Sequence, residues 1–186
     1  MLLTRHLGEL WRYRALVAAL AGRELKGRYR GSVLGFLWTF LNPLLLLLVY
    51  ALVFSVYFRV QMEHYAVFMF TGLLPWIFFS QGLMEGSGAI VDGGSLVTKV
   101  LFPQQVLPAV KVVSNFINFL LSLPILLVFM LADGLRPGLT ILAFPAVALV
   151  HVVFTFACVL VLCVATVFMR DTRHILGNLI TLWFFL

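Results

Sequence analysis

Residues 33–57 read VLGFLWTFLNPLLLLLVYALVFSVY and contain no charged side chain. A helix needs about 20 apolar residues to cross the roughly 30 Å hydrocarbon layer of a membrane, so this run can span it with some tilt. A transmembrane β-strand instead alternates apolar and polar residues over about ten positions, and this unbroken block does not. The run therefore predicts a transmembrane α-helix.

Similar uncharged runs continue along the chain, at residues 65–84, 112–132 and 140–169, and another begins at 175 and stops at 186. Of the 186 residues, 63% are hydrophobic and 11% are charged, and the mean hydropathy is +1.10. A soluble domain is nearer half apolar and a quarter charged, so the composition excludes an ordinary soluble enzyme, a disordered tail and a disulfide-rich secreted domain. We therefore predict an all-α integral membrane protein with four complete spans and the start of a fifth, read as a fragment cut inside that span.

Basic residues predict the orientation of these spans. The chain has 13 Lys and Arg residues, and all but Arg59 and Arg136 lie before the first run, between the second and third, or between the fourth and fifth. Cytoplasmic loops of membrane proteins carry the excess of Lys and Arg, so the N-terminus and residues 85–111 are predicted to be cytoplasmic. The net charge of +6 then reflects topology and contact with anionic lipid headgroups, and nucleic-acid binding is not expected.

Residues 1–31 are predicted to form a cytoplasmic interfacial helix, ahead of a transmembrane domain at 32–186. Its apolar residues that can gather on one side are Leu7, Leu10, Trp11, Val17 and Leu25, a pattern typical of helices lying in the membrane interface. The basic residues expected to anchor it at the membrane surface are Arg23, Lys26, Arg28 and Arg30. Gly27, Gly31 and Gly35 repeat every four residues, which predicts a flat helix face for close packing.

The one long cytoplasmic connection is predicted at residues 85–111. Its glycines are expected to break the preceding helix, a short amphipathic helix follows, and Pro103 and Pro108 interrupt the chain again. Apolar residues such as Ile90, Val91 and Leu96 are unusual in a cytoplasmic segment. Two interpretations stay open for them: a return into the membrane interface, or docking into a partner protein.

Motifs that carry chemistry are missing from this sequence. No Gly-x-x-x-x-Gly-Lys-Ser/Thr loop occurs, so the chain is not expected to hydrolyse nucleotide itself. Cys158 and Cys163 are five residues apart and would project about 140° from each other on a helix, so they neither pair nor bind metal. No carboxylate lies inside an apolar run. We therefore predict no catalytic residue, no metal and no cofactor bound by this chain.

A few polar residues do lie inside the predicted spans. Those at helical spacing on the first and third spans are Thr39 and Asn42, and Asn115, Asn118 and Ser122. Within the run 140–169, His151 is the only ionisable side chain apart from the two thiols. Side chains of this kind join neighbouring helices by hydrogen bonds or line a polar pathway, and both interpretations remain open.

Three stretches of the sequence resemble a known family. They are RELKGRYRGSVLGFLW followed by LNPL in residues 23–44, KVLFPQQVLP at 99–108, and FMRDTRHI at 168–175. They resemble the permease subunit of type-2 ABC transporters that export polysaccharides of the O-antigen, capsule or teichoic acid kind. The resemblance implies six spans per subunit, a homodimer of permease subunits in the bacterial cytoplasmic (inner) membrane, and a lipid-linked glycan substrate. It also implies a separate ATPase subunit that binds ATP and Mg²⁺.

The resemblance further implies where the ATPase subunit docks. The residues expected at this coupling contact are Glu85, Ile90, Val91, Asp92, Ser95, Leu96, Lys99, Arg170, Asp171 and Arg173. Thr39, Asn42, Asn115, Asn118 and His151 are the candidates for lining the export pathway. Three alternatives remain: a type-2 ABC permease for drugs or other lipids, an integral-membrane enzyme acting on polyprenyl-linked sugars, and a membrane anchor without transport activity.

Overall fold

The computed structural model describes residues 11–28, 30–53, 63–94, 103–136 and 138–186. Its α-helices are α2 (Arg14–Arg28), α3 (Trp38–Leu52), α4 (Tyr65–Ser87), α5 (Ala89–Asp92), α7 (Val106–Ala132), α8 (Phe144–Phe168) and α9 (Thr172–Phe185). Short 3₁₀ helices, η1 (Gly35–Leu37) and η3 (Leu139–Ala143), precede α3 and α8. Among the described residues, three helical segments are long and apolar enough to cross a membrane, Tyr65–Ser87, Val106–Ala132 and Leu139–Phe168. The predicted all-α membrane bundle is confirmed.

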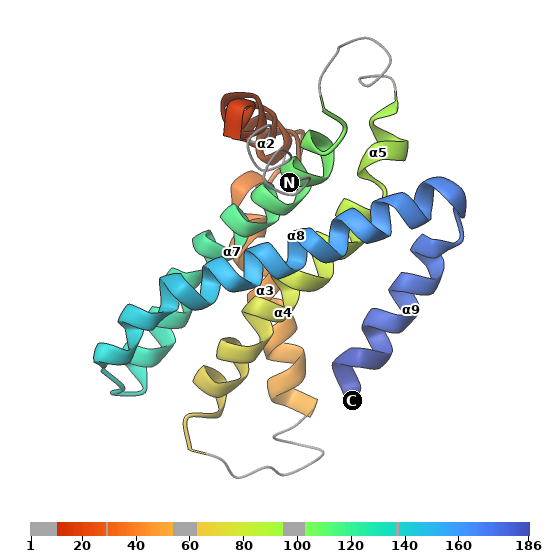
Figure 1. Cartoon of the computed structure of the whole chain (residues 1–186). Helices are drawn as coiled ribbons and strands as arrows, with labels where there is room; N and C mark the ends of the chain where they lie inside the picture. The colour runs from red at the N-terminus through yellow and green to blue at the C-terminus, as the bar shows by residue number, and fades with distance from the viewer. Residues whose placement is uncertain (1–10, 29, 54–62, 95–102, 137) are drawn as a thin grey trace.

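Helix α4 lies at the centre of the bundle. It packs most extensively against α7 and α8, and it also contacts α3 and α9 (Figure 1). Its side chains Phe70, Leu74 and Phe78 are almost fully buried in the core. Helix α2 lies across one end of the bundle, against α7 (Figure 1). The elements predicted on the cytoplasmic side, which are α2, α5 and the α8–α9 turn, share that end.

Glycines bring α4 and α8 close together. A Cβ added at Gly82 would lie 3.1 Å from Thr155, and one added at Gly86 would lie 2.6 Å from Val159. The thiol of Cys163 also donates a hydrogen bond to the carbonyl oxygen of Gly86, at 2.7 Å. Because lipid tails are as apolar as leucine, close packing of this kind, more than exclusion of water, stabilises helix pairs in a membrane.

The helix boundaries differ from the predicted spans at several points. The first span becomes helical at Gly35, whereas residues 54–57 of its expected range lie outside the described residues. Helix α4 continues to Ser87 and α7 begins at Val106, so both ends of the predicted connection 85–111 are helical. Pro108 does not interrupt the chain, because it lies in the first turn of α7, where its missing N–H would have no partner inside the helix.

The expected glycine face is wrong. Helix α2 ends at Arg28, and Gly31 and Gly35 have positive φ angles of 83° and 46°. Glycine adopts this left-handed conformation without the steric penalty of a Cβ. These residues therefore make the turn from α2 into the first span instead of packing one helix on another.

Helix α2 packs on the bundle through one face, which includes Val17 of the predicted apolar side. Its contacting residues are Tyr13, Leu16, Val17, Leu20 and Ala21. They lie at i, i+3, i+4, i+7 and i+8, which is one side of a helix, and they pack on Val106, Ala109 and Val110 of α7. Trp11, expected on the apolar side, is 70% exposed, and Leu7 and Leu10 lie outside the described residues.

Candidate functional site

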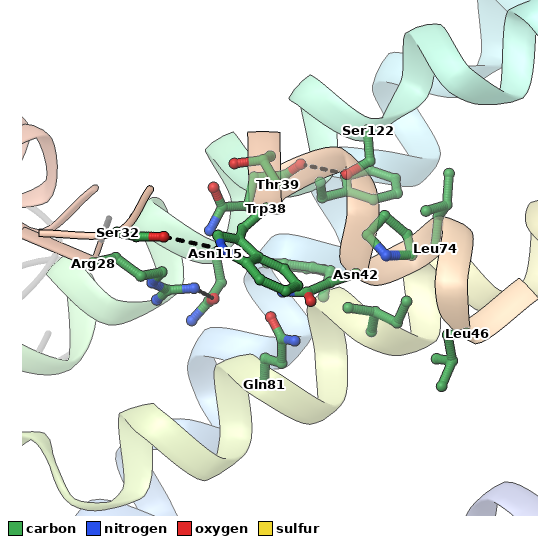
Figure 2. Close-up of a pocket in the computed structure, with 15 residues that line it drawn as sticks. Arg28, Ser32, Trp38, Thr39, Asn42, Leu46, Leu74, Gln81, Asn115 and Ser122 are labelled. Atoms are coloured by element: carbon green, nitrogen blue, oxygen red, sulfur yellow. Dashed lines mark hydrogen bonds between the residues drawn. The ribbon is translucent and has the colours of Figure 1, made fainter. Parts of the chain in front are cut away.

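A polar cavity of about 560 Å³ lies between α3, α4 and α7 (Figure 2). Its polar lining residues are Arg28, Ser32, Thr39, Asn42, Gln81, Asn115, Asn118 and Ser122, together with the indole of Trp38. Apolar side chains line the remainder, among them Leu46, Leu74 and Phe119. Polar groups on three membrane helices thus converge on one space, although these helices are otherwise apolar.

Four of the five predicted pathway residues line this cavity. Thr39 and Asn42 lie one turn apart on α3, and Asn115 and Asn118 lie one turn apart on α7. His151 is not among the lining residues. Its ring contacts Phe78 and Phe79, with centroids 5.0 and 6.0 Å away. His151 lines a separate apolar recess with Val150 and Phe154, and its place on the export pathway stays a prediction.

A hydrogen-bonded cluster lies at the end of the cavity next to α2. The Arg28 guanidinium lies 2.7 Å from the Glu85 carboxylate and donates a 3.3 Å hydrogen bond to the Asn115 side-chain oxygen. The Asn115 amide donates to Glu85 at 2.9 Å and to the backbone oxygen of Lys111 at 3.0 Å. One residue from each of α2, α4 and α7 is thereby held at this end, which we call the cavity mouth.

The cluster continues along α2 as a row of side chains with alternating positive and negative charge. Glu24 lies 2.6 Å from the Lys111 ammonium and 3.9 Å from the Arg28 guanidinium. Lys111, Glu24, Arg28 and Glu85 therefore contribute two positive and two negative charges that offset one another. Their side chains are 20–33% exposed, so they are screened less by water than pairs on an open surface.

Arg28, expected at the lipid headgroups, and Glu85, expected at a partner protein, lie against each other in the structure. The Glu24–Lys111 pair was missed. The i, i+4 spacing of Glu24 and Arg28 was a signal for charge pairing on α2. No pattern in the sequence, however, connects that helix to residues more than fifty positions away.

A second ion pair joins two of the predicted coupling elements. The Arg173 guanidinium donates two hydrogen bonds to the Asp92 carboxylate, at 3.1 and 2.9 Å, and so links α5 to α9. The same guanidinium lies against Gly88, where the structure leaves no room for a Cβ. Paired parallel hydrogen bonds of this kind fix geometry as well as distance.

The other predicted coupling and anchoring residues are more scattered. Ile90 packs partly against the core, whereas the neighbouring Val91 is 41% exposed. Arg170 and Asp171 are exposed in the turn before α9. Residues 95–102, which include the predicted Ser95, Leu96 and Lys99, lie outside the described residues. Arg23, Lys26 and Arg30 are exposed at or just beyond α2, and their anchoring of the helix to lipid stays a prediction.

The chain is 51% identical over 181 residues to the O-antigen export system permease protein RfbA of Myxococcus xanthus, a match that covers 97% of this chain and 70% of that protein. This chain belongs to the O-antigen export permease family. A permease of the same name from Klebsiella pneumoniae is 32% identical over 171 residues, which is 91% of this chain and 66% of the relative. No protein-family model matches the chain.

Membership of the O-antigen export permease family confirms the predicted resemblance. It places the chain among the membrane subunits of transporters and not among membrane enzymes. With three apolar helices of spanning length in the described residues, this O-antigen export permease is a multi-pass protein of the inner membrane. The cavity and its mouth offer amide, hydroxyl, indole and paired charged groups, which suit binding and orientation of a ligand.

Proposed function

We propose that this chain is the membrane permease of an ABC exporter that carries a lipid-linked, O-antigen-type polysaccharide across the inner membrane. Two copies of the chain would form the conduit. A separate ATPase subunit would bind ATP and Mg²⁺ and dock on the end of the bundle that carries α2 and α5. The observation that carries this proposal is the 51% identity to an O-antigen export permease over almost the whole chain.

The polar cavity supports a transport role. Polar side chains inside a membrane segment are costly and in most cases serve a pathway or a ligand. Here they come from α3, α4 and α7, and they meet in one space. A bundle that served only as an anchor would need hydrogen bonds between helices but no cavity of about 560 Å³.

The Asp92–Arg173 pair supports the proposed docking of an ATPase. It joins α5, which follows the end of α4 directly, to the first turn of α9. A partner that contacts exposed Val91 and the exposed turn at Arg170 would therefore act on two membrane helices together. ATP binding can change the bundle only if the partner contacts these elements differently in its two states.

Charge reversal at this ion pair tests the coupling. In the full-length protein, Asp92→Arg and Arg173→Asp are each expected to lower surface O-antigen while ATPase activity of the purified complex persists. An ion pair exposed to this degree is worth about 0.2–1 kcal/mol, so both variants should still insert and fold. The double swap restores the pair with opposite polarity and should recover export.

Asp133→Arg is the matched control, because it makes the same charge change just after the C-terminal end of α7, whose opposite end packs on α2. Unchanged export in both single variants would contradict the coupling role. The broader proposal is tested by affinity purification of the full-length protein from its native membranes. An ATPase subunit is expected to copurify, and its absence under conditions that preserve the permease would refute the assignment.

A further inference from the structure

The polar cavity combines two kinds of lining group, and this combination points to a ligand. Amides, hydroxyls and an indole line it together with aliphatic and aromatic carbon. Its volume of about 560 Å³ lies within the roughly 300–1,000 Å³ of pockets that hold small molecules. In Figure 2, the side chains of Asn42 of α3 and Gln81 of α4 both lie near the Trp38 ring.

Hydrogen bonding between helices accounts for one of the two asparagines on α7. Asn115 is 1% exposed, and both ends of its amide are used, by Arg28, Glu85 and the backbone of α7. Asn118 differs. Its side-chain oxygen is buried and has no hydrogen-bond partner among the residues that the structure describes. A buried acceptor without a partner costs about 1–3 kcal/mol, so a donor from outside the chain would stabilise it.

The charge at the cavity restricts the chemistry of that donor. Arg28 is the one ionisable residue among the lining side chains that the structure describes, and its charge is offset by Glu85 at 2.7 Å. A phosphate or another anion would have to share this guanidinium with the Glu85 carboxylate, whose negative charge repels it. A neutral ligand rich in hydroxyl groups leaves the pair intact and supplies donors to the amide oxygens.

Trp38 adds the feature that distinguishes a sugar from other neutral polar ligands. Its indole N–H donates to the Ser32 hydroxyl at 3.0 Å, which fixes the orientation of the ring, and the ring lines the cavity. A pyranose presents hydroxyl groups at its edge and C–H groups on its face. Amides at the edge and an aromatic surface under the face therefore match both parts of it.

We propose that this cavity, which lies between α3, α4 and α7 of a single subunit, is a binding subsite for a neutral hexopyranose unit. This inference rests on the proposed export of a polysaccharide, and it adds where a sugar ring is held and by which side chains. The side-chain oxygen of Asn118 accepts a hydrogen bond from a sugar hydroxyl. Asn42 and Gln81 contact the edge of the sugar ring, and Trp38 packs on its face.

Saturation-transfer NMR on the full-length protein in lipid nanodiscs tests this subsite. The probes are the methyl pyranosides of glucose, mannose, galactose and rhamnose, each titrated separately. We expect saturation transfer to at least one of them, with an affinity about three- to tenfold weaker in Asn118→Leu, which loses one hydrogen bond. Trp38→Leu is expected to weaken the affinity by a comparable factor. If Asn118→Leu does not fold, Gln81→Leu replaces it as the variant that removes a hydrogen-bonding side chain from the cavity.

The matched controls are Asn178→Leu and Trp183→Leu on α9. They make the same chemical changes outside the cavity and should leave the affinity unchanged. The inference is overturned by no transfer to any of the glycosides, by equal affinity in cavity and control variants, or by tighter binding of glycerophosphoethanolamine, a charged headgroup. If an ATPase subunit copurifies and export continues while no glycoside binds, only the sugar subsite fails and the proposed function stands.

Discussion

Gly86→Ala is expected to destabilise the protein by about 1–3 kcal/mol, because it places a methyl group in the contact between α4 and α8. The new Cβ would lie 2.6 and 2.8 Å from the two Cγ atoms of Val159. Both distances are shorter by about 1 Å than the roughly 3.5–4.0 Å at which carbon atoms attract each other best.

Neither helix can relieve this contact by moving a side chain alone. Val159 is fully buried, and a valine in a helix has one strongly preferred χ1 rotamer. Rotation of its side chain does not help, since both methyl groups face the new Cβ. The two helices must move apart instead, and the expected loss corresponds to a change of about 5- to 150-fold in the folded-to-unfolded ratio.

Equilibrium unfolding of the full-length protein with SDS in mixed micelles, followed by tryptophan fluorescence, measures this loss. Gly72→Ala is the matched control on the same helix. A Cβ there meets no atom within 4 Å, and alanine in a helix is more stable than glycine by about 0.5–1 kcal/mol. Val159→Ala should recover stability in the Gly86→Ala background. Equal stability of the Gly86 and Gly72 variants, or no recovery by Val159→Ala, would refute the packing argument.

Two further predictions use the same assay. Glu24→Lys and Lys111→Glu should each lower the free energy of unfolding by about 1 kcal/mol, because each breaks the 2.6 Å pair between α2 and α7. The double swap should recover most of the loss, and a swap no better than either single variant would count against the pair. Gly31→Ala should cost about 1–2 kcal/mol, since Gly31 has a φ of 83°. Gly27→Ala, with open space around it in α2, should be neutral or stabilising, so equal effects of the two would contradict the turn assignment.

The spans could be predicted from the sequence because charge marks where a helix leaves the hydrocarbon layer. Charge marks the end of a helix less accurately where another part of the protein, instead of water, covers that end. Helix α7 begins at Val106, before the charge of Lys111, and α2 packs on its first two turns. A helix covered in this way does not need a polar sequence, so the charge pattern placed its start too late.

The polar residues of the cavity could be predicted in part, because their spacing along each helix can be read from the sequence. Asn115 and Asn118 lie on one side of α7 whatever packs there, because spacing on a helix fixes direction. The pairing of Arg28 with Glu85 depends on how α2 crosses the bundle, which local sequence does not determine. His151 contacts the rings of Phe78 and Phe79, which sequence spacing does not show, and its role in a pathway stays a prediction.

The last two turns of α4 connect the cavity to the surface proposed for the ATPase. Gln81 lines the cavity, Glu85 forms the mouth cluster one turn later, and α5 begins one further turn on at Ala89. Residues four apart lie on the same side of a helix, so displacement of α5 along α4 would act on the Arg28–Glu85 pair before it reached Gln81. Gly86 meanwhile holds α4 against α8. We therefore expect the cavity mouth to open where Arg28 of α2 meets Glu85 of α4, with α4, α7 and α8 moving together.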